Sequence, residues 1–397
     1  MKILLIDDEP FVLNLLARQL DNLGCTDVVA CERAVDALTQ LGHDAEAVDL
    51  IFCDLQMPEM DGVEFIHQLV HVGYAGALVL VTGEDERILQ TAEKLGQAHK
   101  LNVIGALSKP VSPVQLQRVL ESHAPSVPAL PRGVRKTYEP GELRRAIENG
   151  ELVNHYQPKV EMKSGAVMGA ETLVRWQHPQ DGMVFPDQFI HLAEEHGMID
   201  DLTRTVLSAA LGQARQWQNA GLNLQVAVNI SMDNLTALDF PDFVADSASA
   251  AGVHLSNLML EVTESRLMKD PLKSLEILTR LRLKNVGLSI DDFGTGHSSL
   301  AQLRDIPFNE LKVDRGFVHG AYMDSSLKAI VEASCNLARS MGMKIVAEGV
   351  EDRADWNLLR MLGCDLAQGY FISRPMPASG LAQWMADWET RYHEFQA

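Results

Sequence analysis

The strongest constraint on the fold is a repeated alternation of short apolar runs with longer helical patterns, which is interrupted once along the chain. Between residues 122 and 141 the pattern is lost and four prolines appear, Pro125, Pro128, Pro131 and Pro140. Such a stretch is typical of a stiff connector. Because 397 residues also exceed what one core usually supports, we predict two domains, residues 1–122 and 142–397, with a proline-rich linker over residues 123–141.

Composition and apolar patterning bear on which partners the protein can bind and where it is located. The formal net charge is -20, whereas nucleic-acid backbones demand a basic face, so we expect no direct DNA binding. The apolar start of the chain ends at Asp7, too early for a signal peptide, and no later run approaches the roughly 18 apolar residues of a membrane span. Five scattered cysteines fit reduced thiols. We therefore expect a cytoplasmic protein without membrane contact.

In the N-terminal region, apolar runs at residues 3–6, 50–53, 77–81 and 103–107 alternate with helical patterns. This alternation predicts an α/β domain with a doubly wound parallel sheet. Polar side chains follow these runs, and the carboxyl ends of parallel strands meet at one edge of a sheet. We therefore expect three acids, a hydroxyl and an ammonium to converge there: Asp7, Asp8, Asp54, Thr82 and Lys109. Neighbouring carboxylates repel unless a divalent cation joins them.

These residues and their motifs resemble the receiver domain of bacterial response regulators over residues 1–122. The resemblance implies a five-stranded sheet, Asp54 as the phospho-acceptor, and one Mg²⁺ held by Asp7, Asp8 and Asp54. It also implies that Thr82 and Lys109 contact the phosphoryl oxygens and that a cognate sensor histidine kinase is the partner. Ala106 stands where receivers usually carry an aromatic switch residue, so the signal is expected to be weaker or to use other contacts.

The C-terminal region repeats the alternation more often. Apolar strand candidates lie at residues 156–160, 224–230, 258–262, 286–290, 310–313, 344–347 and 364–367, with helical patterns between them. A region of this length and pattern fits a (β/α)8 TIM-like barrel, for which about 250 residues is the usual size.

Polar residues again gather where the barrel strands end. They are Asn229, Glu261, Asp291, Asp292, Lys312, Asp314 and Glu348. Oxygen ligands without a His or Cys cluster favour Mg²⁺ or Mn²⁺ over zinc. Two such ions can clamp both oxygens of an in-line displacement, which predicts phosphodiester hydrolysis.

The C-terminal region resembles the EAL family of cyclic di-GMP phosphodiesterases over residues 142–385. Eight ordered motifs carry this resemblance: Tyr156-Gln157-Pro158-Lys159, Glu171-Thr172-Leu173-Val174-Arg175-Trp176, Val228-Asn229-Ile230-Ser231, Leu260-Glu261-Val262-Thr263-Glu264-Ser265, Asp291-Asp292-Phe293-Gly294-Thr295-Gly296, Leu311-Lys312-Val313-Asp314, Val346-Ala347-Glu348-Gly349-Val350-Glu351 and Gln368-Gly369-Tyr370. The eponymous Glu-Ala-Leu reads Glu-Thr-Leu here.

The resemblance implies a role for each matching residue. One metal is held by Glu171, Asn229, Glu261 and Asp291, and the second is held or bordered by Asp291, Asp292 and Glu348. Lys312 orients the nucleophilic water, and Glu348 serves as general base or as metal ligand. The substrate contacts are Gln157, Arg175, Asp314 and Gln368. Glu264 and Glu351 anchor the loop of residues 293–299 over the metals.

The leading interpretation is a response regulator that hydrolyses cyclic di-GMP to linear pGpG under the control of Asp54 phosphorylation. An alternative is a catalytically weak sensor that binds cyclic di-GMP and acts through partner proteins. A third is a scaffold whose receiver controls assembly. Both families form dimers, so a homo-oligomer is expected without a fixed stoichiometry. The sequence does not name the kinase, the sign of the phosphorylation effect or the physiological metal.

Overall fold

The computed structural model of the protein describes residues 1–43, 48–83, 86–99, 101–123, 138–231, 233–263, 271–295 and 300–396. The chain forms two compact units, Met1–Val134 and Arg135–Ala397. Residues 124–137, which make up most of the predicted linker, lie outside the described residues. The predicted domain boundaries therefore stay a prediction.

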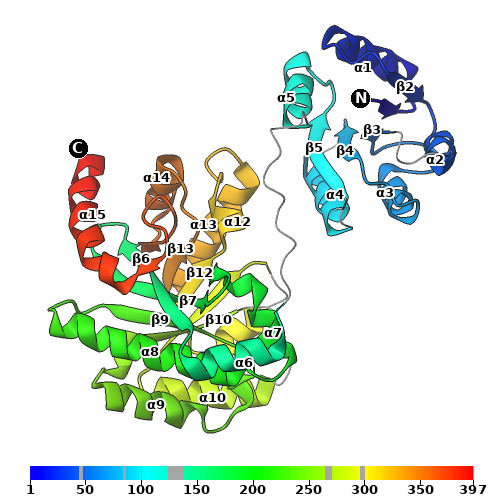
Figure 1. The fold of residues 1–397 in the computed structure, drawn as a ribbon. Helices are drawn as coiled ribbons and strands as arrows, with labels where there is room; N and C mark the ends of the chain where they lie inside the picture. The colour runs from blue at the N-terminus through cyan, green and yellow to red at the C-terminus, as the bar shows by residue number, and fades with distance from the viewer. Residues whose placement is uncertain are drawn as a thin grey trace. The chain divides into compact units, whose positions relative to one another are not determined.

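The N-terminal unit is a parallel sheet with helices on both faces (Figure 1). Its five strands follow the order β2-β1-β3-β4-β5. One apolar core lies between the sheet and α2, α3 and α4, and a second lies between the sheet and α1 and α5. In chain order the elements are β1 (Ile3–Ile6), α1 (Pro10–Asn22), β2 (Val28–Cys31), α2 (Ala34–His43), β3 (Leu50–Asp54), α3 (Gly62–His71), β4 (Ala77–Thr82), α4 (Glu86–Ala98), β5 (Asn102–Ser108) and α5 (Pro113–His123).

This arrangement confirms the predicted doubly wound sheet. Strand β2 was absent from the predicted strands, because it is short, lies at the edge of the sheet and buries only Cys31 completely. Its Val-Val-Ala-Cys run is apolar but only four residues long, and so short a run does not by itself distinguish a strand from other structure.

The C-terminal unit is a closed barrel surrounded by helices (Figure 1). In chain order its elements are α6 (Pro140–Asn149), β6 (Leu152–Glu161), β7 (Val167–His178), β8 (Gly182–Val184), α7 (Ile190–Glu195), α8 (Ile199–Asn219), β9 (Gln225–Ile230), α9 (Phe240–Ala251), β10 (Leu258–Thr263), α10 (Pro271–Leu283), β11 (Gly287–Phe293), α11 (Leu300–Asp305), β12 (Glu310–Val313), α12 (Arg315–Val318), α13 (Ser325–Ser340), β13 (Lys344–Ala347), α14 (Arg353–Leu362), β14 (Leu366–Ala367), β15 (Met376–Pro377) and α15 (Leu381–Gln396).

The barrel closes in the order β6-β14-β13-β12-β11-β10-β9-β7 and back to β6, with β8 and β15 attached at its margin. The predicted barrel class is confirmed, with one departure from a fully parallel ring: β6 is antiparallel to both β7 and β14. The cause is the short connection between β6 and β7, which turns at Gly165 with φ of 73°. A parallel pair needs a crossover of about a dozen residues or more, so this connection permits only a hairpin.

Strand β7 was also absent from the predicted strands. It contains Glu171, Arg175 and His178, all buried, among its apolar residues. These polar residues hide the apolar run that identifies a core strand. Among the described residues, no helix has both the length and the apolar character that crossing a membrane requires.

Candidate active site

The receiver-like unit gathers its predicted residues at the carboxyl edge of the sheet. Asp7 and Asp54 are buried, Asp8 is exposed, and the three offer carboxylate oxygens within 4.8 Å of one another. Lys109 Nζ lies 2.7 Å from Asp7 Oδ2 and 2.8 Å from Asp54 Oδ2. Thr82 is fully buried at the end of β4. The structure therefore brings all five predicted residues to one edge, as strand-end convergence requires.

Asp54 faces an open cavity of about 400 Å³, which Asp8 and Lys109 also line. Burial raises the pKa of Asp54 above its usual value, and the hydrogen bond from Lys109 opposes that shift. Ala106 on β5 is half-buried beside the core under α4. The pocket thus offers a carboxylate that a small donor can approach, with an ammonium next to it.

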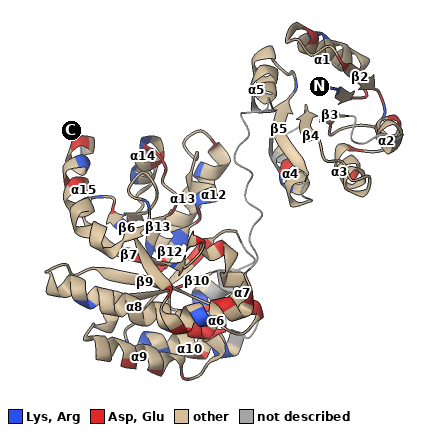
Figure 2. Ribbon diagram, in the orientation of Figure 1, with Lys and Arg blue, Asp and Glu red and all other residues tan. Residues whose placement is uncertain are grey.

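The barrel carries a larger set of acids, together with an asparagine and a lysine, toward the carboxyl ends of its strands. Glu171 lies on β7, Asn229 on β9, Glu261 on β10, and Asp291 with Asp292 on β11. Lys312 lies on β12, and Glu348 directly follows β13. Figure 2 shows acidic and basic segments next to each other around β7 and β12.

Asp291 and Asp292 reach the same site although they are neighbours in one strand, where successive side chains normally point to opposite faces. The pairing between β11 and β12 shifts register between Ile290 and Phe293, and Asp292 has φ of 55°. This irregularity turns the second carboxylate toward the first. Aspartate tolerates the left-handed region better than most residues other than glycine, which fits its use at this bend.

Lys312 stands at the centre of the acids. Its side chain is fully buried, and Nζ lies 2.7 Å from Glu348 Oε1, 3.0 Å from Glu261 Oε2, 3.1 Å from Asp291 Oδ1 and 3.6 Å from Glu171 Oε2. Burial alone favours the neutral amine, but the surrounding carboxylates outweigh it and raise the pKa of Lys312 well above its usual value. One ammonium thus faces four carboxylates.

Lys312 does not neutralise all of the surrounding carboxylates, and the excess negative charge shifts their pKa values. Burial and neighbouring acids raise the pKa of Glu261 to about 8 and that of Asp292 to about 6, and they raise the pKa of Glu348 well above its usual value. Burial also disfavours the charged form of Glu171, but Lys312, Gln368 and Asn229 leave its pKa below the usual value. Acids that resist ionisation so close together are suited to a divalent cation.

Two overlapping groups have the spacing of metal ligands. Glu171, Glu261 and Asp291 offer oxygens within 4.8 Å of one another, and so do Asp291, Asp292 and Glu348. Asp291 belongs to both groups. The donor set therefore fits two neighbouring hard cations, with Asp291 between them.

The amide side chains of the site bind Glu171. Asn229 Nδ2 donates to Glu171 Oε1 over 2.8 Å, and Gln368 Nε2 donates to Glu171 Oε2 over 2.6 Å. Gln368 also donates to Gln157, which in turn donates to the carbonyl of Ser373. Gln157 and Gln368 line a cavity of about 310 Å³ together with Glu171, Asp291, Asp292 and Glu348, named here the acid cavity.

The other predicted residues lie at its margin or beyond the described chain. Arg175 is buried, donates to the carbonyl of Val174 and stacks over Phe185 at 5.2 Å. Asp314 caps α12 through the backbone N–H of Gly316. Glu351 lines the acid cavity and pairs with Arg315. Glu264 and residues 296–299 of the predicted loop lie outside the described residues.

A buried polar network beneath the acids was missed by the sequence interpretation. Lys159 Nζ lies 2.9 Å from Glu310 Oε1 and 3.5 Å from Glu261 Oε1, and Ser289 donates to Glu310. Lys159 and Glu310 are almost completely buried. A lysine inside a predicted barrel strand was the available signal, since a buried ammonium requires an acidic partner.

Comparison with known proteins identifies both units. A model of the EAL domain matches residues 141–375, and a model of the response regulator receiver domain matches residues 3–121. The cyclic di-GMP phosphodiesterase RocR of Pseudomonas aeruginosa is 33% identical over 384 residues, which cover 95% of this chain and 96% of RocR.

Other relatives match a part of the chain. The bifunctional diguanylate cyclase/cyclic di-GMP phosphodiesterase MucR of Pseudomonas aeruginosa is 45% identical over 241 residues. The matched residues make up 60% of this chain but only 35% of MucR. A solved structure of the MucR phosphodiesterase in a c-di-GMP complex matches with a TM-score of 0.58 and 45% identity, covering 61% of this chain and 98% of that one. The chain therefore belongs to the EAL domain family and carries a response regulator receiver domain ahead of the barrel, which confirms both resemblances drawn from its sequence.

Proposed function

We propose that this protein is a response regulator that hydrolyses cyclic di-GMP to linear pGpG in its barrel, under the control of phosphorylation at Asp54. The observation that carries the proposal is the pair of overlapping carboxylate groups that share Asp291 and surround Lys312. The match to RocR over nearly the whole of both chains supports the same activity and the same domain order.

The barrel residues would hold two divalent cations, Mg²⁺ or Mn²⁺. Glu171, Asn229, Glu261 and Asp291 would bind one, and Asp291, Asp292 and Glu348 the other. When bound, the pair would supply electrostatic stabilisation to the phosphodiester oxygens and lower the pKa of a bound water. The carboxylates gain their counter-charge in return, which removes the repulsion that raises their pKa values.

Lys312 and Glu348 are the residues best placed for the proton chemistry. Glu348 lines the acid cavity, and its Oε1 lies 2.7 Å from the buried Nζ of Lys312. Lys312 would orient the attacking water, and Glu348, ionised once the cations are bound, would accept its proton. As the P–O bond of the cyclic substrate breaks, the departing oxygen would take up a proton from solvent, and the proton held by Glu348 would return to solvent, giving the linear dinucleotide.

The substrate would lie over the acid cavity. Gln157 and Gln368 line it, and Arg175 on β7 offers a guanidinium, a group suited to phosphate. Asp314 would contact the substrate from the start of α12. Glu264 and Glu351 would anchor the loop that closes over the cations.

In the receiver unit, an Asp54 carboxylate oxygen would attack the phosphoryl group donated by a sensor histidine kinase. One Mg²⁺ held by Asp7, Asp8 and Asp54 would neutralise the charge of the donor. Lys109 and Thr82 would contact the transferred phosphoryl oxygens. Self-association and a cytoplasmic location stay predictions.

The test is incubation of purified protein with cyclic di-GMP and Mg²⁺, with and without a small-molecule phosphodonor, followed by chromatography of the product. Wild-type protein should release pGpG, and Glu171→Ala should not. Exposed Glu195 on α7 provides the matched control Glu195→Ala. Tight binding of cyclic di-GMP without product in wild-type protein would instead identify a sensor.

A further inference from the structure

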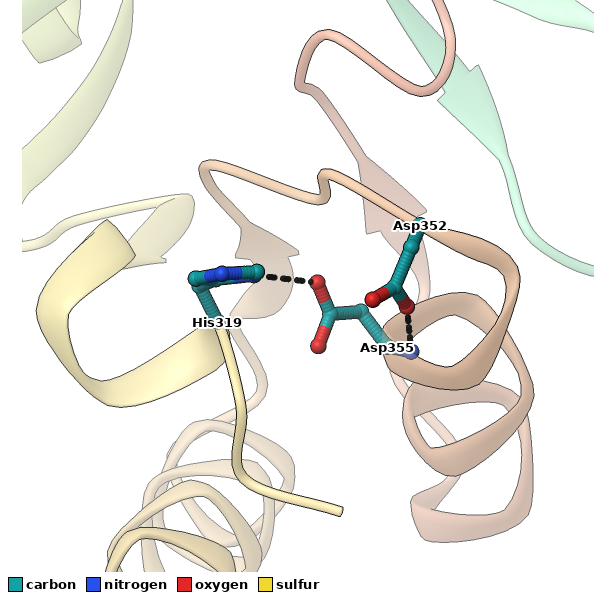
Figure 3. Close-up of side chains that lie close together, drawn as sticks. All are labelled: His319, Asp352 and Asp355. Carbon is teal, nitrogen blue, oxygen red and sulfur yellow. Dashed lines mark hydrogen bonds and ion pairs between the residues drawn. The ribbon is translucent and has the colours of Figure 1, made fainter. Parts of the chain in front are cut away.

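A buried carboxylate lies behind the wall of the acid cavity. Asp355, in the first turn of α14, is fully buried. It accepts hydrogen bonds from His319 Nδ1 at 2.9 Å, from the backbone N–H of Gly320 at 3.0 Å and from the backbone N–H of Glu351 at 3.2 Å. Figure 3 shows the ring of His319 facing Asp355 across the space between two segments of chain.

These three donors come from two different segments. His319 and Gly320 follow α12, which begins directly after the strand of Lys312, whereas Glu351 lies in the segment that joins Glu348 to α14. A buried carboxylate that loses a donor suffers the desolvation cost of an unpaired charge. Asp355 therefore resists any separation of the two segments.

His319 extends this connection to the cavity wall. Its Nε2 lies 3.8 Å from Glu351 Oε2, and Glu351 Oε1 lies 2.5 Å from Arg315 Nη2. The charged groups that face His319 are Asp355, Glu351 and Asp352. The hydrogen bond to Asp355 raises the pKa of His319 above its usual value, and the neighbouring acids add to the shift. A protonated ring can donate to Asp355 from Nδ1 while its charge attracts Glu351.

Close packing reinforces the contact between the segments. Gly349 has φ of 64°, and a Cβ there would lie 2.2 Å from Arg315 Cγ. The stem of Arg315 thus lies directly against the backbone next to Glu348. Both Arg315 and Gly349 line the acid cavity.

We propose that Asp355 and His319 are positioning residues of this site: they hold the segment that carries Glu348 and Glu351 against the strand end that carries Lys312. Neither residue lines the acid cavity as the described residues define it. The inference rests on the proposed function, because it assigns the pair an effect on hydrolysis through Glu348.

Asp352 provides a matched control from the same turn (Figure 3). Its Oδ1 accepts from the backbone N–H groups of Ala354 and Asp355 and so caps α14. Asparagine caps helices as well as aspartate does. Asp352→Asn therefore changes one charge beside His319 while the contact with the other segment stays intact.

The experiment compares His319→Ala, His319→Gln, Asp355→Asn and Asp352→Asn in the full-length protein. We expect kcat/KM to fall about tenfold for His319→Ala and about a hundredfold for Asp355→Asn, mainly in kcat, since a small misplacement of a reacting group costs up to about 10²-fold. His319→Gln should recover most of the activity, because its amide can donate to Asp355. Asp352→Asn should match the wild type.

The pH profile separates this role from simple packing. The imidazolium is present below the raised pKa of His319 and is lost as the pH rises through it. The advantage of the wild type over His319→Gln should therefore be largest at low pH and should disappear at high pH. A constant ratio across the pH range would contradict a role for the charged ring.

The remaining outcomes are also decisive. If folded His319→Ala and Asp355→Asn keep wild-type kcat/KM, or if Asp352→Asn loses as much activity as His319→Ala, the proposal is wrong. If Asp355→Asn fails to fold, the result for His319→Ala alone tests the proposal. The His319 side chain is 44% exposed, so its removal should leave the fold intact. If the wild type hydrolyses nothing, the proposed function fails. The positioning role is then tested by the affinity for a hydrolysis-resistant phosphorothioate analogue of cyclic di-GMP. Weaker binding by His319→Ala than by Asp352→Asn supports positioning, and equal binding overturns it.

Discussion

The two acidic sites of this chain follow one structural rule and differ in how strongly they need a cation. In each, acids at the carboxyl ends of parallel strands surround a lysine from a neighbouring strand end. Lys109 in the receiver unit is 16% exposed and pairs closely with Asp7 and Asp54. Lys312 in the barrel is fully buried and faces four carboxylates.

This difference in burial has an electrostatic consequence. In the receiver unit Lys109 partly offsets the effect of burial on Asp54. In the barrel, Glu261, Asp292 and Glu348 all keep raised pKa values although Lys312 is close. The receiver pocket gathers three acids around a partly exposed lysine, whereas the barrel gathers five acids around a fully buried one, so the barrel has the greater need for resident metal ions.

The largest expected effect comes from removing the barrel lysine. Lys312→Met should lower kcat/KM for cyclic di-GMP by about a hundredfold to a thousandfold, because one positioned donor in a buried site contributes about 10²–10³. Steady-state kinetics measure the loss. Lys344→Met, at an exposed position on β13, is the control.

Phosphorylation of Asp54 gives an internal check on the same variant. Lys312→Met should still incorporate a labelled phosphoryl group, because the receiver unit has its own core. If incorporation is lost together with hydrolysis, the substitution has damaged the protein as a whole. Near-normal hydrolysis would mean that Lys312 serves only to balance charge.

Metal removal at two pH values is the next test. The pKa of Glu261 in the folded protein, about 8, lies above its value of 4.5 in an unfolded chain. Its contribution to metal-free stability is therefore complete below about pH 4.5 and is lost as the pH rises through 8. The raised pKa of Asp292, about 6, gives a similar contribution, which is lost as the pH rises through 6. Calorimetry should show that Mg²⁺ raises the melting temperature by several degrees more at pH 8 than at pH 5.

Glu261→Gln is the control for this pH dependence, since it has no proton to lose. The difference between the two pH values should shrink in that variant. An equal effect of Mg²⁺ at both pH values in the wild type would show that the cations do not compete with protons at Glu261, and the barrel would then resemble the receiver pocket.

A smaller effect is expected from the receiver. Phosphodonor should change the hydrolysis rate about fivefold, the lower end of allosteric coupling, because Ala106 lacks the aromatic ring that receivers usually carry there. Asp54→Asn should abolish both the change and the incorporation of phosphate. A phosphodonor effect that survives in Asp54→Asn would place the regulation outside the receiver pocket.

Much of this comparison could be predicted from the sequence, because side chains at the ends of parallel strands converge whatever the details of the loops. That rule predicted Asp54 near Lys109, and Glu261 near Lys312, because each residue lies where a predicted strand ends. It also placed Asp292 at the site, but it could not predict the register shift and the left-handed backbone conformation that bring this carboxylate beside that of Asp291.

Other features depended on contacts between distant segments. The partnership of Lys159 with Glu310 joins residues 151 positions apart, and the reversed direction of β6 follows from the length of a turn. Asp355 belongs to no motif that carried the family resemblance. Its role becomes visible only when α12 and α14 are seen to meet at its side chain.

The smallest expected effect concerns Thr172, the departure from the family motif, which alters packing in the barrel without altering charge. Its side chain is 3% exposed, and within the described chain Oγ1 has no hydrogen-bond partner. It lines a mainly apolar cavity of about 270 Å³ with Leu202 and Val206 of α8. Thr172→Val should raise the free energy of unfolding by about 1 kcal/mol, because a buried hydroxyl without a partner costs about 1–3 kcal/mol. Urea denaturation measures the change, with Thr172→Ser as the variant that keeps the hydroxyl. A loss of stability in Thr172→Val would mean that ordered water in this cavity binds the hydroxyl, so that the strand of Glu171 is held by polar contacts on both of its faces.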